Sequence, residues 1–594
     1  MIRAISALLL LAVLPRPAFA QIDLSGEWSG VFHEDQEHRV PGPALGDYLG
    51  LPINDAARLK ADSWDASILS AREHQAKPHP STYSLRGPAN IRIRKVLDEV
   101  TSRTIGYEIF GTFGQATRTI WLDGRPHPGP RAPHTWAGFS TGVWDGNSLT
   151  VTTTHVKVGW LQRNGVAHSD QATMTEHFFR HGNELTAVTI VDDPVYLEEP
   201  FIRSTNFILN PGQEVGRTQF DIVDEVAGRP KDYVPHYLPG SPGALSKLTE
   251  YASEHRIPPD ATRGGAVTTY PEYQVALREL AAGTRSAGPA RAPSASTRVA
   301  AAIPDLEDTI QVTHVQGKVY MLSGAGANIT AQIGDEGVLL VDTGATGLSD
   351  KVMAALRQLT DKPIRIVINT HVHPDHVGGN EPIAKIGQWF GGNAPGNFGL
   401  PTTSARVIAH EQVLTRMSAP VGQTAPSPFG AWPTETFFTA DKELFFNGEA
   451  IQLLHQPAAH TDGDVIVFFR RSDVVSAGDL FTTTSYPVID AKSGGTIQGF
   501  IAGLNHILDV TIPEDKEEGG TYVIPGHGRL ADEADVVEFR DMATIVRDRV
   551  RDLVRKGMTL AQVKAARPTL DYDRRYGSPD AFIESIYRDL TAGR

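Results

Sequence analysis

The stretch Thr370-His-Val-His-Pro-Asp-His-Val-Gly-Gly379 decides how this 594-residue chain is interpreted. It places four metal-binding side chains within six residues, namely His371, His373, Asp375 and His376. It directly follows the apolar run Ile364–Thr370, which we predict to be a strand. Two histidines one residue apart can face one metal ion where a strand opens into a loop. The carboxylate and imidazole that follow can then turn toward a second ion as a helix begins. Imidazole and carboxylate donors suit zinc, and also iron or manganese.

Three further candidate ligands lie far along the chain, each at the end of an apolar run and near a glycine. They are His460, Asp479 and His527. Loops at strand ends can converge on one edge of a layered sheet, so ligands distant in sequence can meet there. We therefore predict one metal site built from all seven residues. The isolated histidines of this half are expected to be structural: His314, His410, His455 and His506.

Together with Gly378-Gly379, Gly526-His527-Gly528 and Val341-Asp342-Thr-Gly344, these motifs resemble the metallo-β-lactamase-fold superfamily over roughly residues 305–530. The resemblance implies an α/β fold, an αββα sandwich with a dinuclear metal site between its two sheets. It implies that one ion is bound by His371, His373 and His460, and the other by Asp375, His376 and His527. It further implies that Asp479 bridges the two ions and that Asp342 supports the histidine loop without binding metal.

The resemblance and the ligand chemistry predict a metal-dependent hydrolase acting on a small-molecule substrate. Two divalent ions, zinc in the first place with iron or manganese as alternatives, would supply a metal-bound hydroxide. Its target would be an ester, lactone, thioester, amide or lactam, or phosphoester bond. Asp375 is the predicted catalytic residue, because it is placed to orient the hydroxide and relay a proton.

Two alternatives remain open at this stage. One is a β-lactamase proper, although those members usually carry Cys or Ser where this chain has Asp479. The other is an iron-dependent oxidoreductase similar to the sulfur dioxygenases of this fold. The superfamily does not fix the substrate, because function is determined by loops rather than by the fold.

The residue composition and the position of a Pro- and Gly-rich segment divide the chain into four parts. We predict a signal peptide over 1–20, a β-rich N-terminal domain over 21–282, a linker rich in Ala, Pro, Ser and Gly over 283–302, and the metallo-β-lactamase-fold domain with a helical tail over 303–594. Turn signals at Asp123-Gly124, Asp145-Gly146 and Gly182-Asn183 predict hairpins of an antiparallel barrel or sandwich in the N-terminal domain. We assign no chemistry to that domain.

The chain begins with the features of an export signal. Met1–Arg3 carries one positive charge, Ala4–Leu14 is almost entirely apolar, and Ala18-Phe19-Ala20 is a small-residue cleavage site. We therefore expect a periplasmic or secreted protein that is cut before Gln21. No later segment is long and apolar enough to be a membrane span. Nothing in the sequence indicates the oligomeric state.

Composition excludes several classes of function. The chain has no cysteine, which excludes disulfides, thiolate metal sites and cysteine nucleophiles. Its formal net charge of -14 argues against a nucleic-acid partner, because phosphate binding needs a basic surface.

Two insertions are expected to influence substrate choice. Gly387–Pro401 and Ser418–Phe438 are rich in glycine, proline and aromatic residues. Their aromatic side chains could line a pocket mouth or pack within their own loops: Trp389, Phe390, Phe398, Phe429 and Trp432. We expect Asp462 and Asp464, beside His460, to lie at the surface, with support of the metal site as the alternative.

Overall fold

The computed structural model describes residues 22–31, 43–84, 90–111, 116–216, 221–282, 304–389, 404–420, 424–513 and 520–592. The predicted signal peptide 1–20 and the predicted linker 283–302 lie outside these described residues. Among the described helices, none combines the length and the apolar character needed to cross a membrane.

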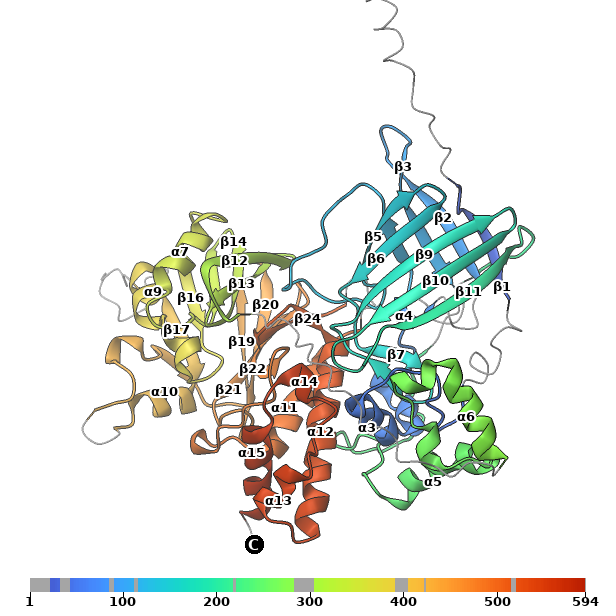
Figure 1. The fold of residues 1–594 in the computed structure, drawn as a ribbon. Helices are drawn as coiled ribbons and strands as arrows, with labels where there is room; N and C mark the ends of the chain where they lie inside the picture. Colours follow the sequence, from blue (N-terminus) through green and yellow to red (C-terminus); the bar gives the residue numbers. More distant parts are fainter. Residues whose placement is uncertain are drawn as a thin grey trace, which may run out of the picture.

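The N-terminal strands form a closed barrel in the order β1-β11-β10-β9-β6-β5-β4-β3-β2 (Figure 1). The strands are β1 (Gly26–Gly30), β2 (Ile91–Leu97), β3 (Thr104–Gly111), β4 (Arg118–Trp121), β5 (Phe139–Asp145), β6 (Ser148–Thr154), β9 (Thr173–His181), β10 (Glu184–Asp192) and β11 (Phe201–Leu209). Trp28, Ile93, Phe178 and Phe207 are among the side chains of its hydrophobic core. The prediction of a β-rich domain is therefore confirmed, in the form of a barrel.

Two of the three predicted hairpins are present. Asp145 pairs with Ser148 across the β5–β6 turn, and His181 pairs with Glu184 across the β9–β10 turn. The third prediction is wrong, because β4 and β5 pair in parallel. The turn at Asp123-Gly124 is followed by a segment with prolines at 126, 128, 130 and 133. Proline has no backbone N–H for a strand ladder, so the chain cannot return as an antiparallel partner there.

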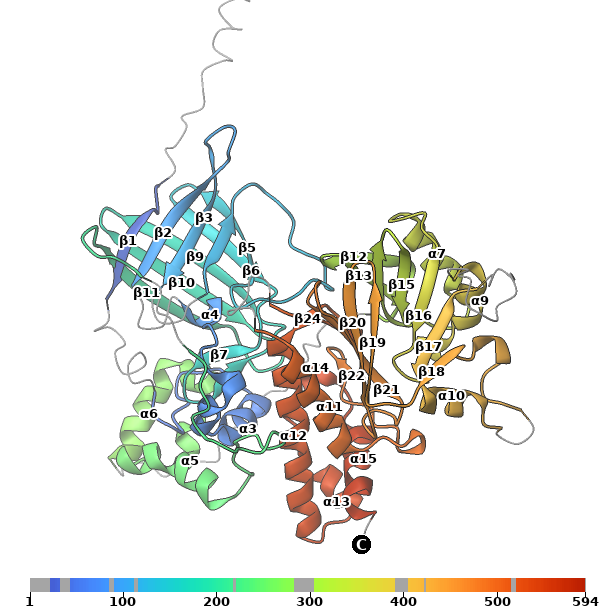
Figure 2. The same ribbon diagram turned by 180° about the vertical axis from the view of Figure 1, so that it is seen from behind.

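Helices and a small hairpin pack at one end of the barrel (Figure 2). They are α3 (Asp55–Ser63), α4 (Ser81–Ser84), β7 (Gly159–Gln162), β8 (Val166–His168), α5 (Pro242–Glu254) and α6 (Pro271–Ala281). α3 and the loops around this hairpin share a second hydrophobic core with Tyr48, Leu51 and Tyr196. Within this group α3 lies nearest to α12, whereas α5 and α6 lie on the side away from the C-terminal helices.

The C-terminal half contains two sheets packed face to face, which confirms the predicted fold class. The first, in the order given, is β12 (Leu306–Gln316), β13 (Val319–Ala325), β14 (Ala327–Gly334), β15 (Gly337–Val341), β16 (Ile364–Ile368), β17 (Arg406–His410) and β18 (Glu435–Phe437). The second is β19 (Asp441–Phe446), β20 (Glu449–Gln456), β21 (Asp464–Phe469), β22 (Val474–Thr482), β23 (Tyr522–His527) and β24 (Ala531–Asp532).

Alternate residues of β15 show how the sequence builds these layers. Leu339 and Val341 join the core between the two sheets, whereas Val338 and Leu340 join the core beneath the outer helices. Because successive strand residues point to opposite faces, a run that is apolar throughout marks a strand covered on both sides.

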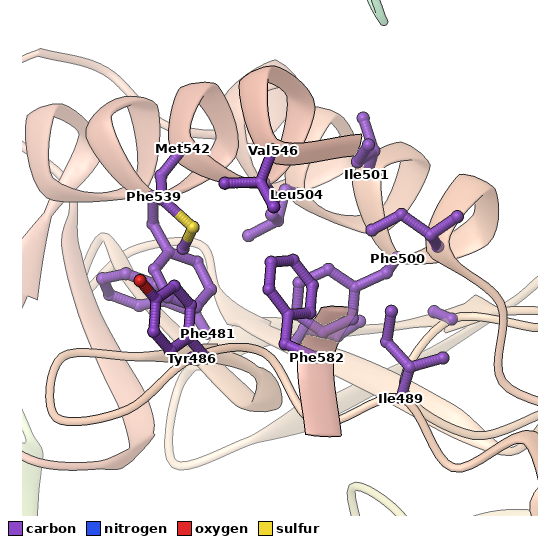
Figure 3. Close-up of a cluster of buried hydrophobic side chains, with 14 of the residues drawn as sticks. Phe481, Tyr486, Ile489, Phe500, Ile501, Leu504, Phe539, Met542, Val546 and Phe582 are labelled. Carbon is purple, nitrogen blue, oxygen red and sulfur yellow. The ribbon is translucent and has the colours of Figure 1, made fainter. Parts of the chain in front are cut away.

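Helices cover the outer face of each sheet. They are α7 (Ser349–Arg357), α8 (Pro374–Val377), α9 (Asn380–Ile386) and α10 (Glu411–Ser418) on the first sheet's side, and α11 (Ile497–Val510), α12 (Glu533–Arg555), α13 (Leu560–Ala565), α14 (Asp573–Tyr576) and α15 (Asp580–Thr591) on the other. Figure 3 shows Phe500 of α11, Phe539 of α12 and Phe582 of α15 in the core that joins these helices to the second sheet.

The helical tail is interrupted at two places. α12 ends at Arg555, Gly557 adopts a positive φ of 77°, and Thr559 caps α13. Glycine is the residue that takes this left-handed conformation without steric cost, so the helix ends there. The second interruption contains Pro568 and separates α13 from α14.

Buried ion pairs join the N-terminal part of the chain to the C-terminal helices. Lys157 Nζ lies 2.7 Å from Asp532 and 3.2 Å from Asp535 at the start of α12. Arg575 lies 3.0 Å from Asp170, and His74 lies 2.7 Å from Asp541. Removing one partner of such a pair leaves an uncompensated buried charge, so these contacts oppose separation of the two parts.

Glu533 at this interface predicts a pH-dependent stability. Burial raises the pKa of its carboxyl to about 7, while the charge of Lys77 opposes the shift. The folded protein therefore binds this proton more tightly than the unfolded chain, and stability falls as pH rises from about 4.5 to about 7. We expect Glu533→Gln to raise the Tm at pH 8 by a few degrees, roughly 1–3 kcal/mol, and to leave it unchanged at pH 4.5.

Thermal unfolding of the purified protein across this pH range measures the effect. Glu254→Gln, at an exposed site at the end of α5, is the control and should follow the parent curve. Parallel curves for Glu533→Gln and the parent would show that Glu533 does not titrate in this window.

Candidate metal centre

The ends of parallel strands bring the predicted ligands together. β15, β16 and β17 run parallel to one another, and β22 runs parallel to β23. Carboxyl ends of parallel strands meet at one edge of a sheet. The structure brings all seven predicted residues to this edge, with His460 supplied by the connection between the antiparallel strands β20 and β21. They form two groups, and within each group the ligand atoms lie within 4.8 Å of one another: His371, His373, His460 and Asp479, then Asp375, His376 and His527.

Asp479 lies between the two groups with one oxygen toward each. Its Oδ2 is 3.7 Å from His371 Nε2 and 3.6 Å from His460 Nε2. Its Oδ1 is 3.1 Å from His376 Nε2 and 3.4 Å from His527 Nε2. This is the arrangement that a carboxylate bridging two ions requires.

In two of the buried histidines, a hydrogen bond from Nδ1, the ring nitrogen that faces away from Asp479, orients the imidazole. His376 Nδ1 donates to Asp342 Oδ2 at 2.7 Å, and His460 Nδ1 donates to the Val488 carbonyl at 2.6 Å. A proton held on Nδ1 leaves the Nε2 lone pair directed at the centre. His373 is reversed, since its Nε2 faces Asp490 at 3.2 Å and its Nδ1 lies 2.9 Å from His460 Nε2.

Unpaired buried atoms show that these residues fit a metal. His371 Nε2, His376 Nε2 and Asp479 Oδ1 are buried and have no hydrogen-bond partner within the described part of the chain. Other buried atoms of the described residues are also unpaired, but these three belong to side chains that converge in one place. A divalent cation would satisfy all three at once, and a donor set of imidazole and carboxylate is one that zinc accepts.

The charges of the cluster are strongly coupled. Burial raises the pKa of the Asp479 carboxyl, but the imidazoles of His376 and His527 outweigh it and hold that pKa well below its usual range. Burial lowers the pKa of His376, yet Asp479 and Asp342 raise it to about 10. Metal binding would have to displace this proton, so affinity should fall as pH falls.

Asp342 supports the histidine loop from beneath. It follows β15 with a φ of 65° and accepts hydrogen bonds from Thr370 N at 2.8 Å and Thr370 Oγ1 at 2.7 Å. With its bond to His376, it connects the end of β16 to the start of α8. Its predicted role beside the ligands agrees with this position.

At two positions near the cluster, neighbouring atoms lie so close to the backbone that only glycine fits. A Cβ at Gly526 would collide with Asp479 Oδ1, and a Cβ at Gly378 would collide with the Pro374 carbonyl and Thr346 N. The glycines that marked these motifs in the sequence therefore make room for the bridging carboxylate and for the tight turn of the histidine loop.

The expectation for Asp464 is wrong. Its carboxylate is buried and accepts from Thr461 N and Thr461 Oγ1, both at 2.7 Å. It thereby fixes the turn that carries His460. Asp462 is partly exposed and pairs with Arg416 at 2.6 Å.

Only some of the aromatic residues predicted to line a pocket mouth are among the described residues. Phe390 and Phe398 lie outside the described residues. Phe429 is 81% exposed, while Trp432 packs on the core that includes Val377. Trp389 stacks with Arg406, whose guanidinium is 4.3 Å from the ring centre.

Sequence reasoning missed two carboxylates beside the cluster. Asp490 lies 3.2 Å from His373 Nε2, and Asp305 lies 3.3 Å from His527 Nδ1. Neither has a glycine or a histidine within three residues in the chain, so the motifs that marked the other residues are absent there.

Comparison with known proteins agrees with this geometry. Residues 324–527 match the model of the metallo-beta-lactamase superfamily. A linear primary-alkylsulfatase from Pseudomonas sp. is 25% identical over 255 residues, which cover 38% of this chain and 46% of the relative. An (R)-specific secondary-alkylsulfatase from Pseudomonas sp. is 24% identical over 337 residues, covering 48% of this chain and 49% of the relative.

Among solved structures, a stereoselective inverting sec-alkylsulfatase from Pseudomonas sp. superimposes with a TM-score of 0.35 and 18% identity, covering 47% of this chain and 50% of that one. The chain thus spans about half the length of the curated relatives it matches. The match and the fold assign the C-terminal half to the metallo-beta-lactamase superfamily.

Asp342→Asn tests the support of the histidine loop. Asparagine tolerates the positive φ and keeps one acceptor, but it replaces the other acceptor with an N–H that opposes the donors of Thr370 and His376. We expect metal affinity to fall roughly 10- to 100-fold, as for loss of an outer hydrogen-bond partner. Competition with a chromophoric chelator measures it.

Asp462→Asn is the matched control, because it is next to His460 in the chain but pairs with Arg416. Its metal affinity should stay at the parent value. Equal affinities in both variants, with unchanged circular dichroism, would contradict the supporting role of Asp342.

Proposed function

We propose that this protein, whose C-terminal half belongs to the metallo-beta-lactamase superfamily, is an exported dinuclear metal-dependent hydrolase. The observation that carries the proposal is Asp479, with one oxygen toward each of two groups of ligand atoms. The hydrolase activity is supported by relatives that include alkylsulfatases and a probable metallo-hydrolase.

The residues around Asp479 suggest how the centre would work. One ion would be held by His371, His373 and His460, the other by Asp375, His376 and His527. When bound, two divalent ions would supply a water of lowered pKa and would polarise the oxygen of the scissile bond. No cysteine or serine nucleophile is then required.

Asp375 is suited to handle the proton. Its Oδ2 lies 3.3 Å from His527 Nε2 and its side chain is 37% exposed, so it borders the open side of the cluster. Although burial raises the pKa of its carboxyl, the hydrogen bond from His527 lowers that pKa below the ordinary value. Asp375 is therefore ionised at neutral pH and can accept a hydrogen bond from the attacking water.

Two observations favour different substrates. The alkylsulfatase relatives favour a sulfate ester. The carboxylates of Asp305 and Asp490 at the edge of the cluster favour an uncharged ester or lactone, because they repel an anionic group. A bridging carboxylate at position 479 argues against a β-lactamase. Relatives named as alkylsulfatases and as a probable metallo-hydrolase favour a hydrolase over a sulfur dioxygenase.

Metal analysis with a hydrolysis panel tests the function. We expect close to two metal ions per chain, zinc foremost, and turnover of one class among alkyl sulfates, lactones, thioesters, lactams and phosphodiesters. A chelator should abolish this turnover and added metal restore it. Redox-active iron with oxygen uptake, or metal content near zero in metal-replete medium, would overturn the proposal.

The variant Asp479→Ala tests whether Asp479 bridges two metal ions or is only a surface carboxylate. Its loss should lower metal occupancy at one site and reduce turnover roughly 10²-fold or more. Asp479→Ser retains a small polar group and should keep part of the activity. Metal content and rate are measured on the same preparations, with Asp509→Ala, an exposed residue paired with Lys231, as control. Full metal and normal rates in both variants would remove the bridging role.

Export is tested at the N-terminus. Expressed in a bacterial host, the protein should be recovered from the periplasm beginning at Gln21, because Ala18 and Ala20 form the cleavage site. Ala18→Arg places a large charged side chain in that site and should leave an uncut chain. Periplasmic material of the parent beginning at Met1 would contradict removal of residues 1–20.

A further inference from the structure

A cavity of about 560 Å³ lies at the junction between the N-terminal part of the chain and the C-terminal helices. α3 and the segment 68–79 form one wall, the loop before β7 forms a second, and α12 with Tyr572 forms a third. None of the seven residues of the metal centre lines it. This volume suits a small organic molecule, and domain junctions are frequent positions for such sites.

Indole rings dominate the apolar part of the cavity. Trp64, Trp136 and Trp160 line it, and the rings of Trp64 and Trp160 meet edge to face with centres 5.7 Å apart. Val537 and Ile545 of α12 add aliphatic surface. Indole faces offer a flat, polarisable surface that favours a ring-bearing ligand.

Most charges in the walls are already neutralised within the protein. Lys60 pairs with Glu538 at 2.7 Å, Arg549 pairs with Asp571 at 2.7 Å, and Lys157 pairs with Asp532 and Asp535. These pairs hold the walls together from both parts of the chain. They also leave little of the lining free to bind an ion.

Lys77 is different. It is half-buried and lines the cavity, and no carboxylate of the described residues lies within ion-pair distance of its ammonium, although the charge of Glu533 acts on it from farther away. Arg163, Asp221 and Glu225 also line the cavity without an ion pair in the described part, but each is exposed, so water screens its charge. The least solvated charge open to a ligand is therefore a cation.

We propose that this interface cavity is a second binding site, separate from the metal centre, for a small amphipathic molecule with an aromatic or fused-ring body and one anionic group. The tryptophans receive the ring system and Lys77 receives the anion. The site requires both parts of the chain, because α12 supplies one wall and the N-terminal helices and loops supply the others.

Two probes with nearly the same ring system test the proposal on the full-length protein. They are 1-anilinonaphthalene-8-sulfonate, which is anionic, and N-phenyl-1-naphthylamine, which lacks the sulfonate. We expect both to bind at one site per chain, as measured by fluorescence titration and equilibrium dialysis. Lys77→Met should weaken binding of the sulfonate about tenfold and leave the amine unchanged, because only the sulfonate uses the ammonium.

Trp160→Leu should weaken both probes, whereas Trp121→Leu on barrel strand β4 is the matched control and should weaken neither. Metal content near the parent value and an unchanged Tm verify that each variant is folded. Failure of either probe to saturate at one site per chain, or identical binding of the sulfonate by Lys77→Met and the parent, would overturn the proposal. Either result is independent of hydrolysis at the metal centre.

Discussion

The carboxylate of Asp479, largely withdrawn from solvent with its side chain 14% exposed, is the constraint on which the proposed metal centre depends. A buried charge is costly unless it is paired, and here it faces four imidazole nitrogens at 3.1 to 3.7 Å. Those nitrogens come from the loop after β16, the loop after β20 and the end of β23. The carboxylate can be accommodated only if these segments converge, and a glycine at position 526 is what allows β23 to approach closely enough.

The architecture of the sandwich favours this convergence at the ends of its strands. Its inter-sheet core is apolar, with Leu339 and Ile366 from one sheet packed with Val467 and Ile524 from the other. Polar and charged side chains therefore collect where the strands end. Residues that hold the imidazoles lie directly behind them: Asp342 behind His376, and Asp464 behind the turn at His460. The ligand positions are set by elements that are themselves buried, so little reorganisation should accompany metal binding.

The sequence predicted which seven side chains converge, because its signals are local. The spacing in 371–376 fixes a loop after a strand, and the glycines next to Asp479 and His527 mark close approach. Asp305 and Asp490 were missed because their contacts are with residues distant in sequence and nothing in their neighbourhood encodes them. Asp464 was misassigned because a charged residue in a Gly-rich turn is usually exposed, whereas here two hydrogen bonds from Thr461 satisfy it. The parallel pairing of β4 and β5 depends on prolines after the turn, which the turn signal alone does not reveal.

The linker predicted over 283–302 divides the chain into two parts of different composition, but buried contacts join these parts. Arg529, two residues after His527, is buried and pairs with Asp535 at 2.6 Å and with Asp170 of the N-terminal part at 3.2 Å. Leu530 N donates to the carbonyl of Arg131, whose guanidinium lies 2.8 Å from Glu307. The N-terminal part thus contacts the chain just after His527 and just after Asp305. These two residues are themselves in contact, with His527 Nδ1 3.3 Å from Asp305 Oδ1. Because His527 belongs to the second group of ligands, the barrel and its loops act as part of the support for that half of the centre, and a chain without them would lose contacts on both sides of this imidazole.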